Sequence, residues 1–385
     1  MNITKRRGAA IAGVLAIALV GAACGSDNSG SSSSATSAAA TTAAATTAGG
    51  ATTTAGGGAA TTAGGATTTV KASGTIQGSG STLQKPYQDE AISSFTKANS
   101  GATVTYGGGG SGKGRTDLKS KVVNFAGSDS PYADADKPTE PIQYYPILFS
   151  PITVSYNVKG VDKLQLSADT IAKIFSRTVK TWNDPAIAAD NPGATLPSTP
   201  ITVAHRSDGS GTTQNFTEYL KAAAPSTWTL GSGSTIQWPA DTQAGNGNPG
   251  VAQIISQTDG GIGYVDLSDA VASKLNYASV KNSSGNYIVP SAESATAAAD
   301  GIDVKPDLTF SAVNTKAPQG YPITAPSWVI VYQTQDASTG PLVKAYLSYL
   351  VGAGQKLLPD LDYASLPSSL QQKAVAQLDQ LKLGA

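Results

Sequence analysis

The chain has 385 residues, which is enough for two domains in addition to an export signal. Its 26 Lys and Arg residues balance 26 Asp and Glu residues, so the net charge is zero and the basic surface of a nucleic-acid-binding protein is excluded. One cysteine and one histidine exclude an internal disulfide and a histidine-rich metal site, and they argue against a Ser-His-Asp triad.

The N-terminus, residues 1–24, has the pattern of a lipoprotein signal peptide. Basic residues at 5–7 precede an apolar run, Ile11–Val20, which is shorter than the ~20 residues that a membrane-spanning helix needs. The small residues before Cys24 resemble the lipidation motif of bacterial lipoproteins, although Gly21 stands where leucine is usual. We predict that Cys24 is lipidated, and simple secretion is the alternative.

Residues 25–72 consist almost wholly of Ser, Ala, Thr and Gly and contain no aromatic residue. Such a segment cannot bury enough apolar surface to offset the entropy lost on ordering. We predict a disordered tether between the lipid anchor and the folded part of the chain.

From Gly74 onward, strand-like and helix-like runs alternate, as in parallel α/β architecture. Three of the strand-like runs end in loops rich in Gly, Ser and Thr that lead directly into helices. The first junction has a strand at 76–77, a loop at 78–82 and a helix from about Lys85. The second has a strand at 103–106, a loop at 107–114 and a helix from near Arg115. The third has a strand at 201–204, a loop at 206–212 and then a helix through Leu220.

These three junctions have the composition of an anion site. The first turn of a helix leaves backbone N–H groups without intrahelical partners. Glycines let an anion approach that backbone closely, and neighbouring hydroxyl groups add donors. Three such loops in one chain indicate a shared oxyanion of the phosphate type.

Two β-rich runs are long enough to cross between domains: Pro146–Asn157 and Ser327–Tyr332. A helix is expected over Ser167–Phe175, with Ser167 or Asp169 as its N-cap. Two crossing strands, with both ends of the folded part in one domain, predict a two-lobed hinged molecule.

Asp129 follows a short strand expected at Val122–Phe125, and α/β proteins place ligands at the carboxyl ends of strands. A carboxylate suits an anion site only if the ligand carries a proton. Phosphate keeps an O–H at neutral pH that Asp129 can accept, whereas sulfate does not. The alternative is that Asp129 caps a turn before Pro131.

Arg206 is the expected charge partner of the anion, because a guanidinium offers paired donors to two oxygens. Asp208 is close enough in sequence to orient it. The alternative is an exposed arginine at a turn. His205, the sole histidine, is expected to end the strand before Arg206.

Two glycine-rich segments resemble nucleotide-binding motifs without completing them. The loop 107–113 has P-loop spacing, but Gly114 stands where a metal-binding Ser or Thr is required. Residues 245–250 have the spacing of a dinucleotide fingerprint, but the residues before them are not strand-like and Pro249 interrupts the loop. We expect a plain loop there, before a helix at Val251–Ser256.

The same residues resemble the periplasmic phosphate-binding proteins of the high-affinity phosphate ABC transporter. Six stretches carry the resemblance: Gly78–Leu83, Phe125–Pro131 (FAGSDSP), Arg206–Thr212 (RSDGSGT), Gly231–Pro239 (GSGSTIQWP), Gly261–Val265 (GIGYV) and Leu361–Pro367 (LDYASLP). It implies a two-lobed periplasmic-binding-protein fold, type II-like, that closes on its ligand by a hinge of two crossing segments. The expected lobes are 73–149 with 323–385, and 150–322.

The resemblance also implies a set of phosphate-binding residues. They are Thr82, the backbone of Leu83, Ser111, Asp129, Arg206, Ser210, Gly211 and Thr212, with Asp208 orienting Arg206. Relatives often have Ser where Gly112 stands, and Lys113 follows it here. Leu83 replaces a common Phe, which matters little if only its N–H is used.

We therefore expect a lipid-anchored solute-binding protein, held outside the cytoplasmic membrane, that delivers phosphate to an ABC permease. It would be a monomer without catalytic residues, metal or cofactor, and it would bind no nucleic acid. One alternative is another tetrahedral oxyanion, such as sulfate or molybdate. A secreted phosphatase is the less favoured alternative, since that chemistry needs an activated nucleophile or metal ions.

Overall fold

The computed structural model describes residues 72–384. The predicted signal peptide, Cys24 and all of the predicted tether except Ala72 lie outside these residues. Among the described helices, none is both long and apolar enough to cross a membrane.

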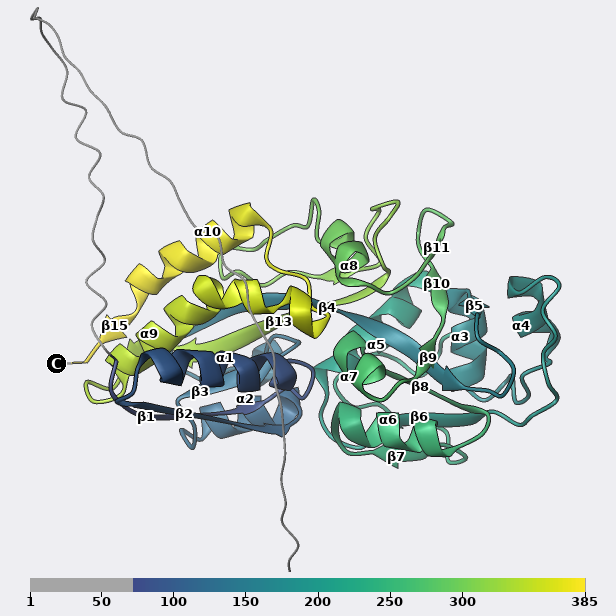
Figure 1. Ribbon diagram of the computed structural model, residues 1–385, viewed down its shortest axis with the longest axis horizontal. Helices are drawn as coiled ribbons and strands as arrows, with labels where there is room; N and C mark the ends of the chain where they lie inside the picture. The colour runs from purple at the N-terminus through teal and green to yellow at the C-terminus, as the bar shows by residue number, and fades with distance from the viewer. Residues whose placement is uncertain (1–71, 385) are drawn as a thin grey trace, which may run out of the picture. The chain divides into compact units, whose positions relative to one another are not determined.

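One mixed sheet of ten strands runs through the structure (Figure 1). In spatial order its strands are β2 (Ala102–Gly109), β1 (Gly74–Gly80), β3 (Phe125–Ser128), β13 (Ile323–Tyr332), β4 (Ile142–Asn157), β8 (Gly261–Asp266), β6 (Thr202–Arg206) and β7 (Gln243–Gly245), with β12 (Ala312–Val313) on β13 and β9 (Asn276–Tyr277) on β4. The three strands β1–β3 are parallel to one another, as are β6–β8, while β13 and β4 run antiparallel to their neighbours.

The strand β4 joins two lobes. Its first part, residues 142–151, pairs with β13, and its second part, Ile152–Asn157, pairs with β8. We call the elements around β1–β3 the first lobe and those around β6–β8 the second lobe. Both long β-rich runs predicted from sequence are strands, although each begins four residues earlier than expected. The lobe boundaries at 149/150 and 322/323 stay predictions.

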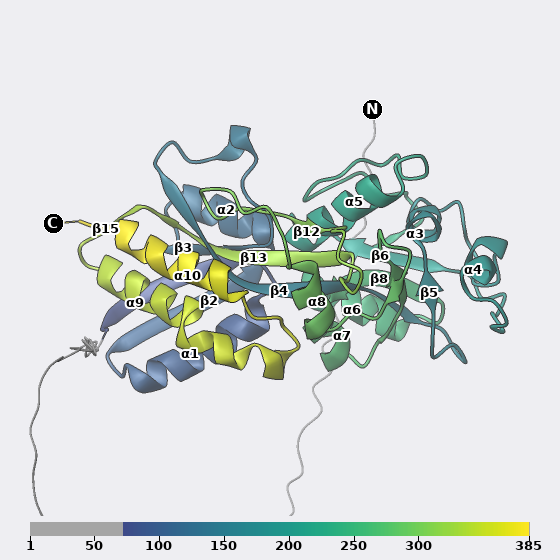
Figure 2. The ribbon, with the colours of Figure 1, turned by 90° about the horizontal axis from the view of Figure 1, so that it is seen from above.

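Helices cover both faces of the sheet, as the two views in Figures 1 and 2 show. The first lobe has α1 (Lys85–Ala98), α2 (Ser111–Lys119), α9 (Gly340–Val351) and α10 (Ser368–Gln377). The second has α3 (Ala168–Phe175), α4 (Pro185–Asp190), α5 (Gly211–Ala223), α6 (Gly247–Gln257) and α7 (Leu267–Ala272), and α8 (Ala292–Ala298) packs on β4. Small strands and 3₁₀ turns complete the fold: β5 (Gln165–Leu166), β10 (Ser279–Lys281), β11 (Tyr287–Ile288), β14 (Thr334–Gln335), β15 (Lys382–Leu383), Asp134–Asp136, Ala353–Leu357, Pro359–Leu361 and Leu378–Gln380.

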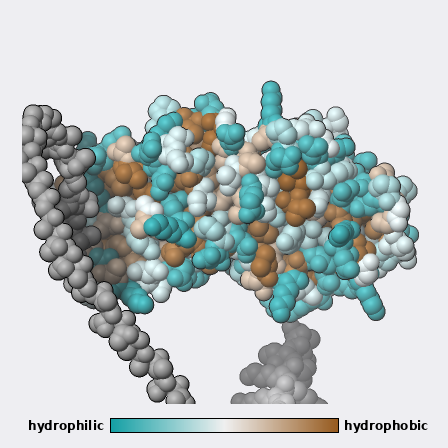
Figure 3. Space-filling model, turned by 45° about the horizontal axis from the view of Figure 1, so that its top comes forward, coloured by the Kyte–Doolittle hydropathy of each residue, from teal (hydrophilic) through white to brown (hydrophobic). Residues whose placement is uncertain are grey.

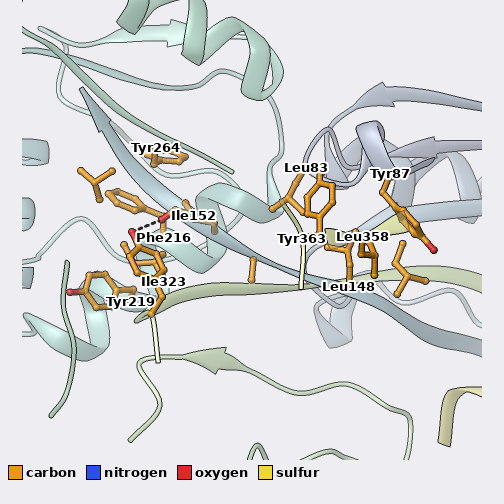
Figure 4. Packing of buried hydrophobic residues seen from close by; sticks show 14 of the residues in the cluster. Leu83, Tyr87, Leu148, Ile152, Phe216, Tyr219, Tyr264, Ile323, Leu358 and Tyr363 are labelled. Atoms are coloured by element: carbon orange, nitrogen blue, oxygen red, sulfur yellow. Dashed lines mark hydrogen bonds between the residues drawn. The ribbon is translucent and has the colours of Figure 1, made fainter. Parts of the chain in front are cut away.

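The core is apolar and aromatic in both lobes. Figure 4 shows two groups of buried residues from this core: Leu83, Tyr87, Leu148, Leu358 and Tyr363 lie together in one group, and Ile152, Phe216, Tyr219, Tyr264 and Ile323 in the other. On the face shown in Figure 3, hydrophobic side chains form small groups among hydrophilic ones. A disulfide-free fold can rest on a core of this size.

Helix starts differ from the sequence predictions at the glycine-rich second junction. The strand β2 continues through Gly109 because its parallel pairing with β1 resumes after a one-residue register shift, where Gly80 pairs with Gly109. Gly109 and Gly110 then turn the chain with φ of 113° and 89°, a region that favours glycine. Helix α2 therefore begins at Ser111 and not near Arg115.

Two more predicted boundaries were wrong. The strand expected at 122–125 is β3 at Phe125–Ser128, because Val122 N donates to the Asp117 carbonyl and closes the end of α2. Residues 245–250 are not a plain loop. A short strand, β7, pairs with β6 there and leads into α6, which starts at Gly247 rather than Val251. The prediction of α3 with Ser167 as its N-cap is confirmed, since Ser167 Oγ accepts from Thr170 N.

Candidate functional site

Strand-to-helix junctions from both lobes meet in the structure. Gly112 N donates to the Gly209 carbonyl oxygen at 2.8 Å, and Asn248 N donates to Thr82 Oγ1 at 3.2 Å. The sequence predicted three junctions, β1–α1, β2–α2 and β6–α5. The structure adds a fourth, β7–α6, which contributes Asn248. The glycine spacing of this junction was visible in the sequence, but the residues before it are not strand-like, and the strand β7 is only three residues long.

The Asp129 carboxylate is buried directly after β3, with 2% of its surface exposed. Ser81 Oγ donates to it at 2.6 Å, Ser327 Oγ at 2.6 Å and Ser111 Oγ at 3.1 Å. Burial raises the pKa of Asp129 above its usual value, although these hydroxyl groups and the charge of Arg206 act in the opposite direction. Ser111 was predicted at the site, whereas Ser81 and Ser327 were not.

Arg206 ends β6 and is buried, with 4% of its surface exposed. Asp208 holds one side of its guanidinium: Nε donates to Oδ1 at 2.8 Å and Nη2 bonds to Oδ2. Nη1 donates to Asn248 Oδ1 at 2.6 Å and to Thr212 Oγ1 at 3.4 Å. Burial raises the pKa of Asp208, but the hydrogen bonds and charge of Arg206 outweigh it and lower that pKa below its usual value.

The N-terminus of α5 lies against Asp129. Ser210 is its N-cap, with Oγ accepting from Thr213 N at 3.0 Å. A Cβ at Gly211 would lie 2.7 Å from Asp129 Cβ and 2.7 Å from Ser111 Oγ. Only a residue without a side chain lets the helix start approach the first lobe this closely.

Several backbone donors at these junctions are buried and unused. Within residues 72–384, no hydrogen bond is made by the N–H groups of Leu83, Ser111, Gly211 and Thr212. All four residues are buried. Buried backbone donors are almost always paired in proteins. Four of them around one carboxylate and one guanidinium form a donor set suited to an oxyanion.

The predicted residues thus come together at these junctions. The Leu83 side chain lies in the core, so only its backbone faces the junctions. Lys113 points to its own helix and pairs with Asp117 at 2.6 Å. Two surface cavities of about 690 and 480 Å³ lie away from the junctions, one lined by β14 residues and the other by the start of α3.

The chain is similar in sequence to known proteins. A profile of the PBP superfamily domain matches residues 37–353. Over 321 residues the chain is 35% identical to "Phosphate-binding protein PstS 2" of Mycobacterium tuberculosis, covering 79% of this chain and 86% of the relative. Over 307 residues it is 34% identical to "Phosphate-binding protein PstS" of Xylella fastidiosa, covering 78% and 84%.

Solved structures share the fold. A high-affinity periplasmic phosphate-binding protein, PfluDING, bound with phosphate, superposes with a TM-score of 0.65 at 23% identity, covering 79% of this chain and 94% of that one. A phosphate-binding protein from Stenotrophomonas maltophilia gives a TM-score of 0.64 at 18% identity, covering 79% and 94%. The two-lobed α/β fold predicted from the sequence is confirmed.

Proposed function

The chain belongs to the PstS phosphate-binding proteins of the PBP superfamily, and we propose that it captures inorganic phosphate between its two lobes and delivers it to an ABC-type permease. The phosphate would lie between Asp129 and Arg206. Its ligands would be the predicted set: Thr82, Leu83, Ser111, Asp129, Arg206, Ser210, Gly211 and Thr212, with Asp208 orienting Arg206.

One observation carries the choice of ligand: a buried carboxylate faces unused N–H donors and a buried guanidinium. The donors and Arg206 suit the charged oxygens of the anion. Asp129 suits its remaining proton, because a carboxylate accepts hydrogen bonds and donates none when ionised. A fully ionised sulfate would offer Asp129 no hydrogen-bond donor of its own and would add charge repulsion, so sulfate and molybdate are not favoured.

The cellular setting extends the proposal. A lipidated Cys24 would hold the protein at the outer face of the cytoplasmic membrane, and residues 25–72 would let the lobes reach the permease as a monomer. The protein would bind and release phosphate without chemistry. Among the described residues the single histidine, His205, contacts the Arg206 carbonyl oxygen through Nδ1, and none of the hydrogen bonds found for it joins it to a serine hydroxyl that it could activate.

Isothermal titration calorimetry tests the ligand directly. We would use the mature chain with Cys24→Ser, stripped of carried-over phosphate by an enzymatic phosphate scavenger. Phosphate and arsenate should bind, and sulfate in large excess should not compete. Equal competition by sulfate would remove the role given to Asp129. Hydrolysis of a chromogenic phosphate ester, with divalent metals added, would support a phosphatase instead.

A further inference from the structure

Behind Arg206, a buried hydrogen-bonded relay continues away from the proposed ligand. Asn248 Oδ1 accepts from Arg206 Nη1 at 2.6 Å, and Asn248 Nδ2 donates to Asp266 Oδ1 at 2.6 Å. Ser268 Oγ donates to Asp266 Oδ2 at 2.5 Å. Asn248 and Asp266 are fully buried. None of these three residues is needed to touch the phosphate.

The relay fixes which way the Asn248 amide points. Its NH₂ group faces the Asp266 carboxylate and its carbonyl oxygen faces the guanidinium. The reversed amide would set NH₂ against the donors of Arg206 and oxygen against oxygen at Asp266. Asp266 therefore keeps the Asn248 carbonyl oxygen in position to accept the hydrogen bond from Arg206 Nη1.

The relay also crosses between the lobes. Tyr363 follows the 3₁₀ turn Pro359–Leu361 in the first lobe, and its hydroxyl donates to the Leu83 carbonyl oxygen at 2.7 Å. The same hydroxyl lies 2.6 Å from Ser268 Oγ on α7 of the second lobe. Because the Ser268 proton goes to Asp266, the single Tyr363 proton is shared between Ser268 Oγ and the Leu83 carbonyl oxygen. In Figure 4 the Tyr363 ring lies beside Leu83. The Tyr363 hydroxyl also lies 3.5 Å from Asp266 Oδ2. Opening of the lobes would move Tyr363 away from both Ser268 and Asp266.

A second carboxyl group adjoins the relay. Asp269 Oδ2 on α7 is buried and has no hydrogen-bond partner among the described residues. Burial and the neighbouring Asp266 charge raise the pKa of Asp269 well above its usual value, and burial raises the pKa of Asp266 as well. The other charged group acting on it is Arg206. Helix α6 and strand β4, which also pack against α7, have no charged residue.

We propose that Asp266 is a positioning residue that orients Asn248 and, through it, the Arg206 guanidinium. Ser268 and Tyr363 hold the Asp266 carboxylate in place when the lobes are closed. Lobe closure would therefore increase the affinity for the anion. This inference rests on the proposed function of phosphate binding. It gives Tyr363 and Ser268 a role in affinity although neither would touch the ligand.

The first test removes one hydroxyl group. Tyr363→Phe should weaken phosphate binding about tenfold, the effect of losing roughly one hydrogen bond. Tyr145→Phe is the matched control, because its buried hydroxyl bonds Gln143 and the Gln377 carbonyl within the first lobe. Its affinity should stay unchanged. If Tyr363→Phe fails to fold, Ser268→Ala takes its place.

A double-mutant cycle separates positioning from general destabilisation. In an Arg206→Lys background, Tyr363→Phe should have little further effect, because the group that the relay positions has been replaced. Additive losses would overturn the proposal, as would wild-type affinity in Tyr363→Phe. If the wild-type chain itself fails to bind phosphate, the proposed function fails instead.

Asp269→Asn supplies a pH readout. Ionisation of Asp269 at high pH would add negative charge to the relay and weaken anion binding. From about pH 7 to about pH 10, wild-type affinity should therefore fall several-fold relative to the variant. Ionisation of phosphate affects both proteins and cancels in the ratio. If the ratio of the wild-type and Asp269→Asn phosphate affinities stays constant over this pH range, the Asp266–Asp269 carboxyl pair does not influence anion binding.

Discussion

Asn215 on α5 of the second lobe donates a 2.7 Å hydrogen bond from Nδ2 to the backbone carbonyl oxygen of Asp129 in the first lobe. The same amide also donates to the Gly211 carbonyl oxygen at 2.9 Å. One side chain thus ties the end of β3 to the start of α5. This contact links the two lobes, and it brings the acidic and the donor-rich parts of the site together.

Asp129→Asn should weaken phosphate binding by about 1.5–3 kcal/mol, the range for a hydrogen bond to a charged group. It should also let sulfate bind more strongly than it binds the wild type, because the repulsive charge is gone. Calorimetry with both anions measures the two effects. Asp117→Asn is the control, since that carboxylate pairs with Lys113 and Ser79 instead. Unchanged selectivity would contradict the assignment.

Arg206→Lys should cost about 1.5–3 kcal/mol of phosphate binding free energy. Lysine keeps the charge, but it lacks the planar guanidinium with several N–H donors. A single ammonium group cannot hydrogen-bond Asp208 and Asn248 and also offer paired donors to the anion. Arg177→Lys in the same lobe is the matched control, since Arg177 pairs with Asp241 away from the junctions. Equal affinities of Arg206→Lys and wild type would place Arg206 outside the site.

Gly211→Ala should reduce phosphate affinity by at least tenfold, or about 1.4 kcal/mol. The added methyl group would meet Asp129 and Ser111 across the lobes, so closure is blocked while each lobe still folds. A thermal melt in the absence of phosphate should stay close to wild type. Gly107→Ala serves as control because the nearest atom to its Cβ would be 4.0 Å away. A normal affinity in Gly211→Ala would show that the closed contact is dispensable.

Phosphate should decrease the radius of gyration, because its proposed ligands come from both lobes and a bound anion would favour the closed arrangement. Small-angle scattering of the mature chain with Cys24→Ser, with and without saturating phosphate, measures this. Asp129→Ala should diminish the compaction. Identical curves in a sample with confirmed binding would mean that the lobes are already closed when empty.

Cys24→Ser in the full chain should move the protein from the membrane fraction to the soluble extracytoplasmic fraction. Without the thiol there is no site for the lipid, and the apolar signal segment is removed on export. Fractionation followed by immunoblotting decides the question, with Ser26→Ala as a neighbouring control. A variant that stays with the membrane would favour an anchor other than lipidated cysteine.

The fold class, the two long β-rich crossings and three of the four strand–helix junctions could be predicted from the amino-acid sequence. Those features depend on local patterns: alternation of apolar residues, and glycines where a strand turns into a helix. Arg206, Asp208 and Asp129 could also be found, because each follows a recognisable strand and each has a charge that an oxyanion site can use.

The groups that surround those charges are set by tertiary contacts. Ser327 reaches Asp129 across 198 positions of the chain because β13 lies beside β3, with Trp328 opposite Ser128. Asn248 meets Arg206 and Thr82 because β7 pairs with β6 and the lobes are closed. Such contacts depend on strand register and on the relative position of two lobes, which no local pattern specifies.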